Sequence, residues 1–124
     1  MPSTTAKTKA EVKREVLGEI AVTLLPVEKL KLPSPRGVPF ENEIHDFLVT
    51  HFNGYTVSSG SISGHWKDDA GRDHYGEHRQ YKVATGAGGS GGRLEGFLAK
   101  LAREMGEECI YLEVGREILL IYHQ

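Results

Sequence analysis

Residues 54–83 read GYTVSSGSISGHWKDDAGRDHYGEHRQYKV, and this stretch decides the fold of the chain. From Tyr55 to Trp66, odd and even positions differ in character, which predicts a strand with two unlike faces. His78–Val83 is rich in strand-forming residues, and the KDDAGRD link at 67–73 is rich in turn residues. The stretch therefore predicts two antiparallel strands joined by a polar turn, with ionisable side chains concentrated around that turn.

Two helices and three further strands are expected around this hairpin. Apolar residues at helical spacing predict one helix over 39–52 and a second over 94–105, each followed closely by a glycine. A strand is expected within 15–25, and a helix over 6–16 is the competing interpretation. The segment 108–123 predicts two closing strands with a turn near 114–116.

This order of strand, helix, strand, strand, helix and strand, with one added final strand, resembles the ferredoxin-like superfold. The resemblance extends over residues 15–122 and consists of element order alone, without a family motif. It implies an α+β fold of βαββαβ order with an extra C-terminal strand, an antiparallel sheet and two helices on one face. PII-type signalling proteins, dimeric α+β barrel enzymes and small bacterial domains use this plan. We expect a single domain over 15–124 after a flexible tail at 1–14.

Length and charge narrow the function classes. The chain has 124 residues and a formal net charge of -2, so it is sized for one domain and lacks the basic excess typical of nucleic-acid binding. It holds no apolar run near the ~18 residues that a membrane-spanning helix needs, and no secretory signal pattern. Its single cysteine, Cys109, cannot form an internal disulfide. These features predict a cytoplasmic protein that binds neither nucleic acid nor membranes.

The hairpin carries the candidate acid–base chemistry. His65 and Glu77 would face each other across adjacent strands, which suits general acid–base catalysis. Side chains expected to orient a ligand beside this pair are Trp66, Tyr75, Arg79 and Tyr81.

The sequence HYGEH at 74–78 matches the H-x-x-E-H spelling of inverzincin metalloproteases, in which one helix presents two histidines to zinc. Gly76 inside the motif and the strand-like residues after it argue against such a helix. His74 and His78 remain candidate ligands for a divalent metal ion at the end of the hairpin. The competing interpretation is a solvated turn with no cofactor.

Residues 84–92, ATGAGGSGG, are rich in glycine and predict a flexible loop or linker. An anion-binding loop is the alternative, because exposed amides before a helix can hold a phosphate. The glycine spacing matches neither common phosphate-binding motif.

The serine-rich segment YTVSSGSISG fits poorly in a hydrophobic core, so one sheet face is expected to meet water, a ligand or a subunit. We therefore expect a homodimer or homotrimer. The first functional expectation is a non-enzymatic binding or regulatory domain that holds a small molecule or partner protein near residues 65–81. The alternative is a small enzyme of the dimeric α+β barrel type that uses His65 and Glu77, with or without a metal ion.

Overall fold

A computed structural model describes residues 12–86 and 91–123 of this chain, which form six strands and two α-helices. The strands are β1 (Ile20–Pro26), β2 (Gly54–Val57), β3 (Ile62–Lys67), β4 (Asp73–Ala84), β5 (Cys109–Val114) and β6 (Glu117–Tyr122). The helices are α2 (Phe40–His51) and α3 (Gly91–Met105), and a 3₁₀ turn η1 (Val27–Lys29) follows β1. Both helices and the two closing strands thus form where the sequence predicts them.

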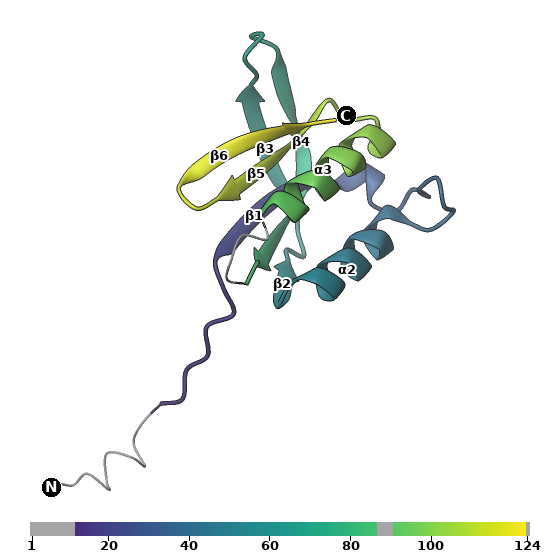
Figure 1. The fold of residues 1–124 in the computed structure, drawn as a ribbon. Coiled ribbons are helices and arrows are strands. Elements are labelled where there is room, and N and C mark those ends of the chain that lie inside the picture. The colour runs from purple at the N-terminus through teal and green to yellow at the C-terminus, as the bar shows by residue number, and fades with distance from the viewer. Residues whose placement is uncertain (1–11, 87–90, 124) are drawn as a thin grey trace, which may run out of the picture.

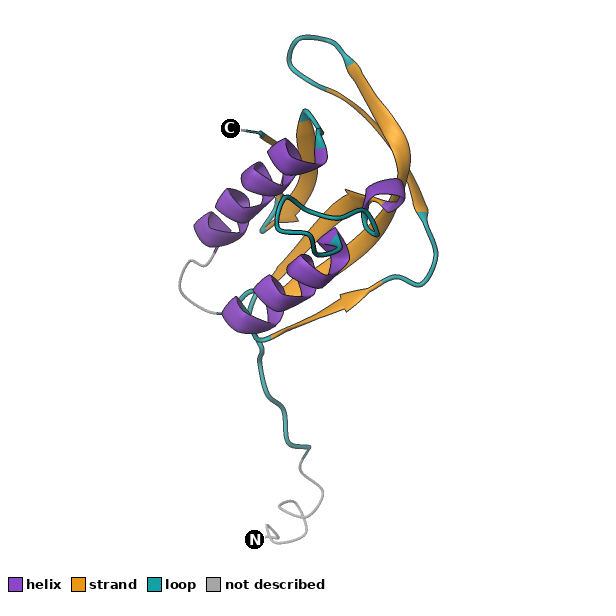
Figure 2. Cartoon of the chain, turned by 90° about the vertical axis from the view of Figure 1, so that its right-hand side faces the viewer, coloured by secondary structure: helices purple, strands orange, loops and turns teal. Residues whose placement is uncertain are grey.

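All six strands join one antiparallel sheet. Its order is β2–β4–β1–β5–β6, and β3 also pairs with β4. Figures 1 and 2 show α2 and α3 side by side on one face of this sheet. The expected α+β class, with an antiparallel sheet and two helices on one face, is confirmed. The strand order is consistent with the ferredoxin-like plan, in which the outer strands flank a central antiparallel pair.

The hydrophobic core lies between the helices and the sheet. Ala21 and Leu25 of β1 enter it from the sheet, and Ile44 and Leu48 enter it from α2. The helices also contact each other through Phe47 and Phe97, whose rings stack with centroids 3.9 Å apart. Because strand side chains alternate between faces, each strand that fills this core also presents a second set of residues to the opposite face.

A polar link ties the two helices together at the surface. Arg36, in the loop before α2, donates to Glu43 of α2 at 2.7 Å and to Glu104 of α3 at 2.5 Å. The hydrogen bond from Arg36 keeps the pKa of Glu43 below its ordinary value, so this carboxylate stays ionised. The guanidinium therefore lies between two carboxylates and fixes the loop against both helices.

The expected strand over 54–66 is interrupted between β2 and β3. At Ser58 a side chain takes the place of a backbone group in the hydrogen bonding between strands. The Ser58 N–H donates to the Gln80 carbonyl at 2.9 Å, and the Ser58 hydroxyl, rather than a backbone carbonyl, accepts the Gln80 N–H at 3.0 Å. The same hydroxyl donates to the Gly60 carbonyl at 2.9 Å, which bends the chain. Serine competes with the backbone for hydrogen bonds, and this competition ends β2.

Strand β4 is longer than expected, because it begins at Asp73 rather than at His78. Residues 73–78 pair with β3, and residues 78–84 pair with β1. The β3–β4 hairpin therefore extends past the end of the remaining sheet, as Figure 1 shows. This extension carries most of the residues that the sequence marks for chemistry.

The N-terminal tail and the glycine-rich stretch are described only in part. Of the predicted tail, residues 1–11 lie outside the described part of the chain, and the residues after them run away from the body in Figures 1 and 2 until Leu17, whose carbonyl accepts a hydrogen bond from the Asn53 side chain at 2.8 Å. Strand β1 begins at Ile20, within the range expected for it. Of the glycine-rich stretch, residues 87–90 lie outside the described part, and α3 begins at Gly91. Within the described residues, no helix is long and apolar enough to cross a membrane.

Candidate functional site

A pocket lies where the β3–β4 hairpin curls toward β5. Ile110 and Leu112 of β5 are buried in the core, so Tyr111 between them faces the other side of the sheet, toward the hairpin. The space between them is a cavity of about 190 Å³. We call it the aromatic pocket, and its lining includes Leu24, Pro26, Trp66, Asp73, His74, His78, Glu107, Cys109 and Tyr111.

Three rings form the wall of the aromatic pocket. The Trp66 ring lies 5.2 Å from His78 and 5.0 Å from Tyr111, measured between centroids. The hydroxyl of Tyr111 donates to Glu113 at 2.6 Å, and burial is the main cause that raises the pKa of Tyr111 to about 12. The phenol therefore keeps its proton at physiological pH.

Two polar atoms in this wall have no hydrogen-bond partner in the described part of the chain. They are Nδ1 of His78, a residue only 8% exposed, and Nε1 of Trp66. Buried polar atoms in native proteins are nearly always paired, because leaving one unpaired costs about 1–3 kcal/mol. Unpaired atoms beside a cavity are therefore natural contact points for a ligand.

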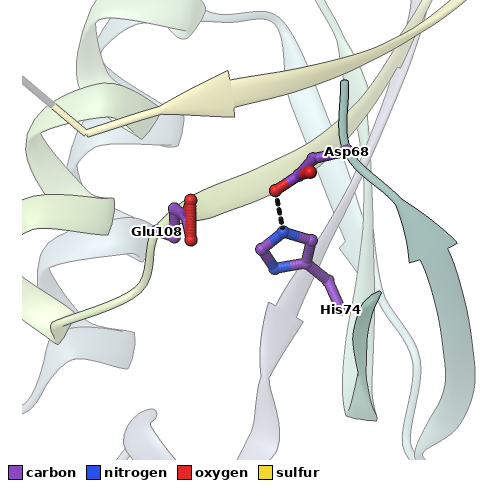
Figure 3. A group of neighbouring side chains, drawn as sticks. All are labelled: Asp68, His74 and Glu108. Carbon is purple, nitrogen blue, oxygen red and sulfur yellow. Dashed lines mark hydrogen bonds and ion pairs between the residues drawn. The ribbon is translucent and has the colours of Figure 1, made fainter. Parts of the chain in front are cut away.

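His74 contributes an imidazole whose orientation is fixed by a buried carboxylate. Its Nε2 lies 2.9 Å from Oδ2 of Asp68, and the second ring nitrogen points away from Asp68 (Figure 3). Asp68 also accepts the backbone N–H groups of Ala70 and Arg72, each at 2.9 Å. The contact with His74, followed by these backbone contacts, lowers the pKa of Asp68 to about 2. An ionised carboxylate at Nε2 favours the tautomer that leaves Nδ1 free to accept a proton.

Asp68, His74 and Glu108 offer three ligand atoms within 4.8 Å of one another, which is the spacing of a cation site. Figure 3 shows these side chains converging from the hairpin and from the residue directly before β5. Arg72 contacts both carboxylates, with Nε 3.3 Å from Asp68 and Nη2 bonded to Glu108. A divalent ion would have to displace this guanidinium, which already neutralises both carboxylates. Metal binding by Asp68, His74 and Glu108 therefore stays a proposal.

His65 and Glu77 lie on the outer face of the hairpin, and they do not face each other. The register pairs His65 with Tyr75 and Glu77 with Ser63, which corrects the expected juxtaposition. Nε2 of His65 lies 3.5 Å from Asp73. Glu77 instead accepts hydrogen bonds from the hydroxyls of Ser63 and Ser61, and these lower its pKa. The two residues therefore share a surface without forming a hydrogen-bonded pair.

The four expected ligand-orienting side chains are dispersed. Trp66 and Tyr75 both line the aromatic pocket, but the Tyr75 side chain is 78% exposed and lies beside His65 on the outer face. Tyr81 is buried in the core and stacks on Tyr55, so it has no access to a ligand. Arg79 is half-buried opposite Leu25 of β1, at the junction of the hairpin with the sheet. These side chains lie apart because β4 is longer than expected and successive strand residues point to opposite faces.

The inverzincin interpretation of residues 74–78 does not fit the structure. These residues lie in β4, where Glu77 points to the opposite face from His74 and His78. Both histidines line the aromatic pocket. Their role as metal ligands stays a prediction.

Sequence reasoning missed Tyr111 and the pairing of Asp68 with His74. A signal for Tyr111 exists, because it alternates with Ile110 and Leu112 and must leave the core face. The Asp68 contact has a weaker signal, since an aspartate that opens a turn usually bonds backbone amides two to four residues later. That it also reaches a histidine depends on the register of the hairpin.

Comparison with known proteins gives one informative likeness. No protein-family model matches the chain, and no curated protein matches it in sequence. Among solved structures, the chain resembles a phage SAM lyase in complex with S-methyl-5'-thioadenosine. The TM-score is 0.55 at 11% identity, over 90% of this chain and 95% of that chain. At this identity the likeness is one of fold.

This likeness corrects the first functional expectation. A non-enzymatic binding or regulatory domain was expected near residues 65–81, whereas the solved protein with this fold over nearly its whole length is an enzyme. The finding favours the alternative, a small α+β enzyme.

Proposed function

We propose that this protein is an enzyme that cleaves a carbon–sulfur bond of S-adenosylmethionine or a closely related sulfonium nucleoside. The observation that carries the proposal is the aromatic pocket, where Trp66, Tyr111 and the unpaired Nδ1 of buried His78 line a cavity of about 190 Å³. The solved SAM lyase with the same fold supplies the ligand class. A pocket with an aromatic wall and few polar contact points is typical of small-molecule sites.

The reaction is defined by the difference between substrate and product. S-Adenosylmethionine contains S-methyl-5'-thioadenosine and a four-carbon amino-acid chain joined through the sulfonium sulfur. When the bond from sulfur to the γ-carbon breaks, its electron pair stays on sulfur, which becomes a neutral thioether. The γ-carbon then takes electrons either from a β-carbon C–H bond, which forms a double bond, or from the substrate's own carboxylate, which forms a lactone. Only the first route needs a proton acceptor.

His74 is the proton acceptor that the site offers for the first route. Its Nε2 is held by Asp68, and the side chain lines the aromatic pocket. Nδ1 would take the β-proton, and the buried carboxylate would stabilise the imidazolium that forms. Asp68 acts here as a positioning residue, because it contacts His74 and not the pocket.

The nucleoside needs more space than the aromatic pocket provides. Ligand pockets usually measure about 300–1,000 Å³, and this cavity measures about 190 Å³. An adjoining cavity of about 380 Å³ shares four lining residues with it and extends along Val27 and Glu28. A ligand that spans both cavities would place its sulfur end in the aromatic pocket and its larger part outside.

The test is incubation of the purified full chain with S-adenosylmethionine and analysis of products by liquid chromatography and mass spectrometry. We expect S-methyl-5'-thioadenosine and an unsaturated amino acid. His74→Gln should lower kcat about 10²- to 10⁴-fold, the usual contribution of a positioned base. The matched control is His65→Gln, which changes a histidine on the same hairpin but on the face away from the aromatic pocket.

Each outcome decides a separate claim. Absence of S-methyl-5'-thioadenosine with folded wild-type protein would reject the function. A lactone product with undiminished turnover in His74→Gln would keep the function and reject the base. If His65→Gln and Glu77→Gln lose turnover while His74→Gln keeps it, then His65 and Glu77 would be the catalytic residues and His74 would not.

A further inference from the structure

We propose that the aromatic pocket binds the positively charged onium centre of its ligand, a methylated sulfonium or quaternary ammonium group. The identification of the onium as a sulfonium rests on the proposed function, whereas the preference for an onium rests on the pocket alone. Charge, wall chemistry and size each support it.

The charge of the lining is negative. Glu107 contributes a carboxylate, and no lysine or arginine is among the described residues that line the cavity. Oε2 of Glu107 lies 2.6 Å from Lys29. The carboxylate of Asp73, another lining residue, instead bonds Lys67 at 2.8 Å on the outer face of the hairpin. A cation in the pocket is therefore favoured over an anion.

The wall suits a cation that has no N–H or O–H groups to satisfy. Trp66 and Tyr111 lie 5.0 Å apart between centroids and present π systems, which attract cations. Leu24 and Pro26 add apolar surface that would contact methyl groups. A primary ammonium would leave N–H groups unpaired against these residues, at a cost that a methylated onium avoids.

The size of the cavity fits an onium group better than a nucleoside. Its volume of about 190 Å³ is close to that of an engineered protein cavity of ~150 Å³ that binds benzene. A sulfur or nitrogen atom with its methyl and methylene substituents is of this size. The nucleoside would lie in the adjoining cavity described above.

This placement has a kinetic consequence. Cleavage of the carbon–sulfur bond removes the positive charge, so a wall that stabilises the cation stabilises the substrate at least as much as the transition state. Weakening the wall should therefore raise KM without lowering kcat. A wall residue with a merely structural role would lower the amount of folded enzyme instead.

The binding test uses tetramethylammonium and needs no turnover. Trp66 is the only tryptophan of the chain, so its fluorescence reports on the pocket directly. We expect a saturable fluorescence change with tetramethylammonium and a much weaker response to tert-butanol, an uncharged molecule of similar shape. Tyr111→Leu should weaken onium binding about 2- to 30-fold, the range of one cation–π contact. The control is Tyr122→Leu, because Tyr122 lies on β6 and outside the pocket lining.

Equal affinity for both probes, or equal effects of the Tyr111→Leu and Tyr122→Leu substitutions, would overturn the inference. Saturable binding of tetramethylammonium without cleavage of S-adenosylmethionine would support the inference and reject the proposed function. Cleavage of S-adenosylmethionine without a preference for tetramethylammonium over tert-butanol would support the proposed function and overturn the inference. In an active enzyme, Tyr111→Leu should raise KM at unchanged kcat, and a lowered kcat at unchanged KM would count against the assignment.

Discussion

Gly64 shows how a single missing side chain shapes the aromatic pocket. A Cβ atom at this position would lie 2.3 Å from Cζ3 of Trp66, so the indole ring lies directly over the glycine. Gly76 is paired with Gly64 across the hairpin. Because neither glycine has a side chain, the indole ring can lie close to the backbone of the two strands. The position of the Trp66 ring in the aromatic pocket therefore depends on the absence of a side chain at Gly64.

We expect Gly64→Ala to push the indole away from Tyr111 and to weaken onium binding. Overpacking of this kind typically costs about 1–3 kcal/mol of unfolding free energy. Urea unfolding measures the loss of stability, and the emission maximum of Trp66 reports the move of the ring toward water. Gly60→Ala is the control, since nothing lies within 4 Å of a Cβ atom there. An unchanged emission maximum in Gly64→Ala would show that the indole does not need this space.

At the scale of the element, the β3–β4 hairpin is held by its turn. Asp68 closes that turn: its N–H donates to the Arg72 carbonyl, and its carboxylate accepts two backbone N–H groups. His74, on the returning strand, then bonds the same carboxylate. One residue therefore organises both the turn and the catalytic imidazole of the proposed enzyme.

This arrangement predicts an acid dependence of stability. The folded pKa of Asp68 is about 2, against an ordinary value of 3.8, so its stabilising contribution is complete above about pH 4 and is lost as the pH falls toward 2. Asp68→Asn should therefore be less stable than wild type near neutral pH, and the gap should narrow below pH 4. Urea unfolding of both proteins across this range measures the gap. A gap that stays constant with pH would mean that ionisation of Asp68 contributes nothing.

Helix boundaries could be predicted closely, and the hairpin could not. The spacing of Phe40, Ile44 and Leu48 is a local signal of one buried helix face. The start of β4 at Asp73 depends instead on pairing with β3, and the end of β2 depends on the contact of Ser58 with Gln80. Pairing between distant strands is not encoded in either segment alone.

At the scale of the whole molecule, the helices cover one sheet face, and the opposite face keeps exposed apolar side chains outside the aromatic pocket. Ile20 of β1 is 61% exposed and Ile118 of β6 is 67% exposed, on the face opposite to the core. Exposed apolar side chains on an open sheet face are typical of an interface between copies of a chain. The expected homodimer or homotrimer thus stays a prediction with a defined surface.

We expect native mass spectrometry at micromolar concentration to show a dimer or trimer. Ile118→Glu should shift the population to monomer, because burying an unpaired carboxylate in an interface is costly. Circular dichroism would confirm that the variant keeps its fold. The matched control is Val49→Glu, which adds the same charge to an exposed apolar position of α2. A wild-type protein that is monomeric throughout would remove the sheet face as an interface.

The sequence by itself determined the α+β class, the order of elements and both helices, because helical spacing, strand alternation and turn residues act over a few neighbouring positions. It also predicted a site on the hairpin that includes Trp66, His74 and His78, and this site stays a prediction. Only the tertiary structure decided that Trp66 meets Tyr111, that His74 meets Asp68, and that His65 and Glu77 lie outside the pocket. These contacts depend on strand register and on the curl of the hairpin over β5, which arise when distant segments bury their surfaces together.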